Sequence, residues 1–155
     1  MNITLETLLT QENEFQFNDF TCEDALQIGL LIIKIAKEEI KKGVAIHIEN
    51  DEYPLFTHFM EGTSGNNLYW VNAKKNTVKK FGHSSLYLGE MYKQQGTTFH
   101  KATDLPDTEF QAEGGSFPLI VHGQGRIGTI TVSGLSGEED HALVIEAIKR
   151  HLNIK

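Results

Sequence analysis

The chain has 155 residues and a mass of 17.4 kDa, which is enough for one domain with a substantial apolar core. Its composition, 39% hydrophobic and 23% charged, excludes a disordered or fibrous protein, and its 1 cysteine excludes a disulfide framework or a cysteine-based zinc site. A net charge of −7 argues against a general nucleic-acid or anionic-membrane binder. Residues 1–6 lack the basic and apolar regions of a signal peptide, and no apolar run could span a bilayer. We therefore expect a cytoplasmic protein with a single domain over 1–155.

Helical patterns open the chain. Leucines at helical spacing predict a short helix over 3–11, and three phenylalanines in 15–20 indicate an extended segment. A capping-box pattern that starts at Thr21 predicts a second helix, which ends at Gly43. Over 25–33 this helix is apolar on nearly every side, so we expect it in the centre of the fold or at a subunit interface.

The rest of the chain alternates between hairpins and helices. The order is hairpin, two helices, loop, hairpin and helix, over 44–60, 66–81, 86–95, 96–115, 117–133 and 136–152. Hairpins build an antiparallel sheet, and amphipathic helices must cover it. We therefore predict an α+β fold with a central antiparallel sheet flanked by helices.

Two further patterns have simple structural interpretations. Residues 123–128 match G-x-G-x-x-G, but a strand follows instead of the helix that a dinucleotide site needs, so we interpret them as a hairpin turn. The chain has 7 histidines, none in a tight ligand pair. His47 and His58 lie on adjacent predicted strands, where they either approach each other or are two separate histidines on the sheet surface.

Lys74 is unusual because it lies on the apolar stripe of the helix over 66–81, together with Trp70. One interpretation is a lysine whose stem packs in the core while its amine reaches water. The other is an amine presented to an acidic ligand group beside the indole ring. The consecutive Gly114 and Gly115 allow a close backbone approach, either to another segment of the chain or to a ligand.

The start of the last helix is a second candidate region. His141 follows Asp140 and lies on the apolar stripe of that helix. The preceding bend, with Ser133 and Gly134, brings a glycine-containing turn to the helix N-terminus, which suits an anion. His141 is therefore either a structural residue whose hydrogen bonds are made within the protein, or part of the wall of a pocket. An imidazole at this position can also bind haem iron axially.

Two groups of residues form a pattern that extends over nearly the whole chain. They are Asn67, Trp70, Lys74, Thr77, Val78, Phe81, Gly82, Ser84 and Ser85, followed by Gly114, Gly115, Phe117–Leu119, Ile127–Ile130, Val132–Leu135 and Glu139–His141. This pattern resembles a family of small, uncharacterised cytosolic proteins in the GlcG/HbpS-like superfamily, which is often labelled a haem-degrading domain.

The resemblance implies a profilin-like sheet flanked by helices and assembly into dimers or larger rings. It implies less about function, although members of the wider superfamily bind haem. Our first hypothesis is that the protein binds a small anionic molecule or haem, with His141 as the candidate iron ligand and Lys74 as the partner of an acidic ligand group. The candidate ligand-binding residues are Trp70, Lys74, Ser84, Ser85, Gly114, Gly115, Phe117, Ser133, Gly134, Asp140 and His141.

Two alternatives remain open. One is a ligand-free oligomeric accessory or scaffold protein in which Trp70 anchors an interface. The other is a haem-degrading or small-acid enzyme in which His141 acts as acid and base. Adjacent residues on a helix point about 100° apart, so Asp140 is poorly placed to orient the imidazole of His141. We therefore rank the enzyme hypothesis third.

Overall fold

The structure, a computed structural model, describes residues 3–154 and contains a four-stranded antiparallel sheet in the order β2-β1-β4-β3. The strands are β1 (Ala45–Asn50), β2 (Pro54–Phe59), β3 (Ser116–Val121) and β4 (Gly125–Ser133). Both hairpins are confirmed, and the central strands β1 and β4 also pair with each other. The predicted α+β class with a central antiparallel sheet is therefore confirmed.

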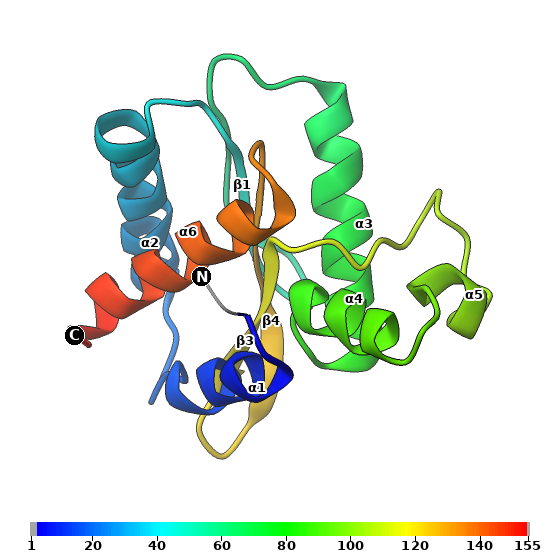
Figure 1. Ribbon diagram of the computed structural model, residues 1–155. Helices are drawn as coiled ribbons and strands as arrows, with labels where there is room; N and C mark the ends of the chain where they lie inside the picture. Colours follow the sequence, from blue (N-terminus) through cyan, green and yellow to red (C-terminus); the bar gives the residue numbers. More distant parts are fainter. Residues whose placement is uncertain (1–2, 155) are drawn as a thin grey trace.

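Helices cover both faces of this sheet, which gives three layers (Figure 1). α2 and α6 lie on one face, α3 lies on the other, and α4 lies beside α3. The helical elements are α1 (Leu5–Glu14), α2 (Cys22–Ile35), its π-helical continuation η1 (Ala36–Ile40), α3 (Gly65–Phe81), α4 (Ser85–Gln94), α5 (Phe99–Thr103) and α6 (Gly137–Leu152).

The two faces of the sheet differ in polarity because successive side chains of a strand point to opposite sides. The face toward α2 and α6 is apolar and holds the main core, with Ile46, Ile48, Phe117, Leu119, Ile130 and Val132 all buried. The face toward α3 is polar and carries His47, Glu49, Ser116, Thr129, Thr131 and Ser133, which are also buried. Only the second face offers buried polar groups to a site.

Local sequence signals set most helix boundaries. The capping boxes predicted at Thr21 and Ser136 are present, and a further one joins Ser64 to Asn67 at the start of α3. The prediction of an uninterrupted loop over 96–115 is wrong, because the short helix α5 forms there with Thr98 as its N-cap. Five residues are too few to show a helical period.

The apolar helix α2 lies in the centre of the fold, which is one of the two interpretations of its sequence. Its inner side is fully buried against the sheet and α6, while Leu26 and Leu30 remain 41% and 52% exposed. Within the described part of the chain, no helix combines the length and the hydropathy that crossing a membrane requires.

Candidate functional site

A concave pocket of about 380 Å³ lies where the N-terminal half of α3 faces the end of β4 and the first turn of α6. We call it the α3–α6 pocket. Its volume falls within the range of small-molecule sites. Its lining residues are Asn66, Asn67, Trp70, Lys74, Glu113, Ser133, Gly134, Leu135, Gly137 and Asp140.

Lys74 forms the floor of this pocket and is only 2% exposed. Its ammonium Nζ donates to the carbonyl oxygens of Gly114 at 3.1 Å and Val132 at 2.6 Å, and to Oδ2 of Asp140 at 3.2 Å. A lysine has three N–H donors, so these acceptors occupy all of them. The amine of Lys74 therefore neither reaches water nor remains free for a ligand. Its hydrogen bonds connect α3 to β4 and α6.

Asp140 is the acidic partner in this tie and is also 2% exposed. Its Oδ1 accepts a hydrogen bond from the backbone N–H of Leu135 at 2.9 Å. Burial raises the pKa of Asp140 to about 6, although the Lys74 charge opposes this. Burial likewise lowers the pKa of Lys74, against the charges of Asp140 and Glu113. Burial therefore disfavours the charged form of both Lys74 and Asp140.

Gly115 makes room for the ammonium group. Its φ is +134°, a conformation that side-chain-bearing residues rarely adopt, and a Cβ there would lie 2.4 Å from Nζ of Lys74. The close backbone approach expected of the two glycines is to other segments of the chain: Gly115 approaches Lys74, and Gly114 approaches Gly137, whose carbonyl oxygen would lie 2.2 Å from a Cβ. The two glycines belong to the wall behind the ion pair.

The structure brings together one part of the predicted site and separates the other. Trp70, Lys74, Ser133, Gly134 and Asp140 line the α3–α6 pocket, and Gly114 and Gly115 pack behind it. Three more predicted residues lie elsewhere: Ser84 is the N-cap of α4, Ser85 Oγ accepts from the backbone N–H of Ser116, and Phe117 is in the main core.

His141 points away from the pocket. It is 4% exposed, and its Nε2 donates to Oε1 of Gln11 in α1 at 2.7 Å. It lines a second cavity of about 360 Å³ between α1 and α6. Burial lowers the pKa of His141 to about 4, so the imidazole is neutral at pH 7.

Some pocket residues escaped sequence reasoning. Asn66, Glu113, Leu135 and Gly137 line the α3–α6 pocket although none is a predicted ligand residue. The Asn67 side chain donates to Ser133 Oγ at 3.1 Å, a contact across 66 positions of sequence. The capping pattern around Ser64 is the one sequence signal that could have pointed to this end of α3.

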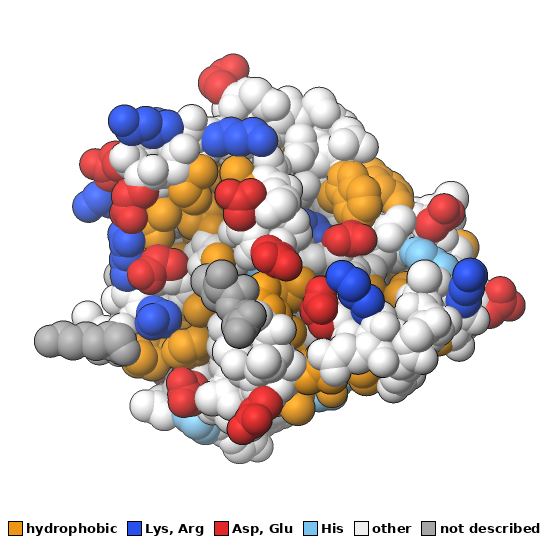
Figure 2. Space-filling model, viewed as in Figure 1, with side chains coloured by type: hydrophobic (Ala, Val, Ile, Leu, Met, Phe, Trp, Pro, Cys, Tyr) orange, Lys and Arg blue, Asp and Glu red, His pale blue; other side chains and the backbone are white. Residues whose placement is uncertain are grey.

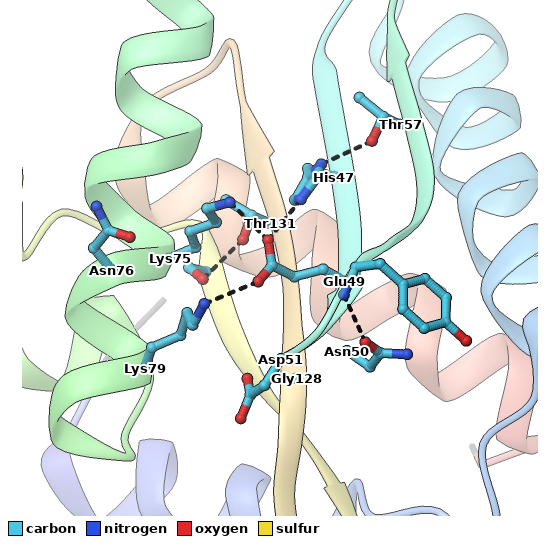
Figure 3. A network of polar contacts seen from close by, with 12 residues as sticks. His47, Glu49, Asn50, Asp51, Thr57, Lys75, Asn76, Lys79, Gly128 and Thr131 are labelled. Atoms are coloured by element: carbon cyan, nitrogen blue, oxygen red, sulfur yellow. Dashed lines mark hydrogen bonds and ion pairs between the residues drawn. The ribbon is translucent and has the colours of Figure 1, made fainter.

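A second polar cluster lies on the same face of the sheet, between β1 and the middle of α3 (Figure 3). Glu49 accepts from Lys75 Nζ at 2.6 Å, from His47 Nε2 at 2.8 Å and from Lys79 Nζ at 3.2 Å. These donors lower the pKa of Glu49 well below its usual range, although burial opposes them. The two ammonium groups more than balance the charge of Glu49, and their ion pairs attach α3 to β1.

The two histidines of the first hairpin do not share a site. In the register of β1 and β2, His47 is opposite Thr57, and its Nδ1 lies 2.8 Å from the Thr57 hydroxyl. His58 is opposite Ile46, so its side chain belongs to the other face of the sheet. The interpretation of the G-x-G-x-x-G match as a hairpin turn is confirmed, with β4 beginning at Gly125.

Comparison with known proteins supports one family. The family described as "Haem degrading protein HbpS-like" matches residues 20–149, so the chain belongs to the HbpS-like family. It is 37% identical over 149 residues to the UPF0303 protein SCO2848 of Streptomyces coelicolor, which covers 96% of this chain and 94% of that protein. The resemblance inferred from the sequence is thereby confirmed.

Solved structures agree on the fold. The crystal structure of the Ybr137w protein has a TM-score of 0.86 and 27% identity, and covers 99% of this chain and 90% of that chain. The crystal structure of a PduOC–heme complex has a TM-score of 0.72 and 20% identity, and the match covers 88% of this chain and 96% of that chain. At that identity the second likeness concerns the fold alone.

Proposed function

We propose that the protein is a small-molecule-binding protein whose ligand occupies the α3–α6 pocket. The observation that carries this proposal is the Lys74–Asp140 pair, buried at the base of a polar concave cavity. A buried ion pair is seldom more stabilising than an apolar pair of similar volume, so stability alone does not account for it. Perturbed ionisable groups in a cleft are typical of binding and catalytic sites.

Haem is a poor fit to this pocket. The PduOC structure is a haem complex, and the family description names haem degradation. Haem iron is held by His, Cys, Met or Tyr side chains. The described residues that line the α3–α6 pocket include none of these, and His141 donates to Gln11 in a different cavity. We therefore propose a ligand other than haem for this pocket.

The test uses Trp70, which is the protein's 1 tryptophan and lines the pocket. A metabolite library is screened by tryptophan fluorescence, and a true ligand gives a saturable change. Asn66→Arg places a long side chain in the pocket and should weaken binding at least about tenfold, roughly 1.4 kcal/mol. Asn72→Arg changes an exposed α3 residue outside the pocket and should leave affinity unchanged.

Haemin is titrated in parallel and followed by visible absorption. No change of Trp70 fluorescence with any compound would contradict the proposal. A stoichiometric Soret shift that is lost in His141→Ala would also contradict it, because the ligand would then lie between α1 and α6.

Self-association is the second candidate property. Leu26 and Leu30 leave an exposed apolar stripe on α2, which favours a homo-oligomer and is compatible with a scaffold role. Light scattering should give a mass above 17.4 kDa for the wild type and a smaller mass for Leu26→Glu/Leu30→Glu. Leu68→Glu, on α3, is the control at another exposed leucine. A monomeric wild type would exclude the oligomer.

The enzymatic alternative has the least support. It requires Asp140 to assist His141, yet Asp140 pairs with Lys74 and His141 with Gln11. These partners belong to α3 and α1, so the two side chains work in different parts of the structure.

A further inference from the structure

The charges around the α3–α6 pocket do not balance. Lys74 and Asp140 neutralise each other at the floor. Glu113, an exposed residue on the rim, adds a further carboxylate, and its charge acts on Lys74 without forming an ion pair within 4.0 Å among the described residues. The charged residues that line the pocket are thus the ammonium of Lys74 and the carboxylates of Glu113 and Asp140, which leaves an excess of negative charge. The three N–H groups of Lys74 already have acceptors, so Lys74 has no further donor for a ligand anion.

The N-terminus of α6 does not reverse this excess. A helix N-terminus normally attracts anions through its unpaired N–H groups. Here the first turn of α6 carries Glu138, Glu139 and Asp140. The backbone N–H of Leu135 donates to Asp140, and that of Glu139 donates to Ser136 Oγ. The chain's own carboxylate and cap therefore already use part of the hydrogen-bonding capacity that a ligand anion would need, and the acidic first turn repels an anion.

Trp70 supplies the complementary surface. It is half-buried in the pocket wall, and Tyr69 packs edge-on against it with ring centroids 5.3 Å apart. The face of an indole ring attracts cations. In Figure 2 acidic side chains lie over the start of α6 and next to the hydrophobic surface at the N-terminal part of α3. An aromatic face beside uncompensated carboxylate is the environment that binds organic cations.

We propose that the ligand of the α3–α6 pocket is a small organic cation, with an ammonium or guanidinium group held between the Trp70 ring and the Glu113 carboxylate. This inference rests on the proposed binding function and specifies its ligand class. It replaces the anionic ligand that a free Lys74 amine would have favoured.

The sign of the charge at the pocket can be measured without knowing the ligand. Collisional quenching of Trp70 by Cs⁺ and by iodide, each normalised to N-acetyltryptophanamide, compares access of a cation with access of an anion. We expect Cs⁺ to be the more efficient normalised quencher in the wild type. Glu113→Gln should move the ratio toward iodide, whereas Glu52→Gln, in the exposed β1–β2 turn, should not.

Binding is then tested with three five-carbon compounds that differ in charge, namely cadaverine, glutarate and 1,5-pentanediol. Cadaverine should bind at least about tenfold more tightly than glutarate, and Glu113→Gln should remove most of this preference. A preference for glutarate, or a normalised iodide quenching equal to that of Cs⁺, would overturn the inference even if the library screen finds a ligand. If the Cs⁺ preference holds but no library compound binds, the proposed function fails and the charge assignment stands.

Discussion

Replacing Lys74 by methionine should lower the free energy of unfolding by about 3–5 kcal/mol, the usual cost of leaving a buried charge without its partner. Asp140 would lose its cation, and the carbonyl oxygens of Gly114 and Val132 would lose their donor. Methionine keeps the volume and shape of the lysine stem, so the loss measures the ammonium group.

The double variant Lys74→Met/Asp140→Asn should be more stable than Lys74→Met alone. Asparagine is neutral and still offers an oxygen to the backbone N–H of Leu135. Denaturant unfolding followed by circular dichroism gives both values, with Lys80→Met at the exposed side of α3 as the control. Equal stability of Lys74→Met and Lys80→Met would show that the buried pair does not hold α3 in place.

The second large effect concerns pH and His141. The pKa of His141 is about 4 in the folded protein and 6.5 as its ordinary value, so the unfolded chain binds more protons between these limits. Stability from the neutral imidazole is therefore lost as the pH falls from about 6.5 to 4, by roughly 3 kcal/mol. The free energy of unfolding of His141→Gln, taken relative to that of the wild type, should therefore rise by roughly 3 kcal/mol when the pH is lowered from 7 to 4.

The neighbouring Asp140 has the opposite dependence. Its pKa is about 6 when folded and 3.8 as its ordinary value, so the folded protein binds more protons between these limits. Stability from Asp140 consequently falls as the pH rises from about 4 to 6. In the wild type, the pH dependences of stability from His141 and Asp140 partly cancel. In His141→Gln only the pH dependence from Asp140 remains. Parallel stability curves for wild type and variant at pH 4 and 7 would contradict the assignment for His141, because Asp140 is present in both proteins. A variant whose stability does not fall between pH 4 and 7 would contradict the assignment for Asp140.

Periodicity and capping patterns were enough to predict the two hairpins, the sheet and the long helices. They could also place Lys74 and His141 on the apolar stripes of their helices. They could not show that Lys74 and Asp140 meet, because the contact joins residues 66 positions apart on different helices. The pairing depends on how α3 and α6 dock, which no local pattern encodes.

The prediction that His141 lines the ligand pocket was wrong for a similar reason, since it depended on how helices dock. His141 and Asp140 are adjacent, so they point about 100° apart and contact different layers. Whether His141 would line the pocket depended on the position of α1, whose Gln11 accepts its hydrogen bond. Lys75 and Lys79 donate to Glu49 on the polar face of the sheet, and this contact too depends on how α3 docks.

The polar contacts beneath α3 also fix its longitudinal register on the sheet. A shift of one helical turn, about 5.4 Å, would separate Lys74 from Asp140, because the residues one turn away on α3 are Trp70 and Val78, which cannot replace the ammonium group. The Lys74–Asp140 pair therefore helps to fix the position of Trp70 relative to the first turn of α6. Because both line the α3–α6 pocket, the pair also helps to set the width of that pocket.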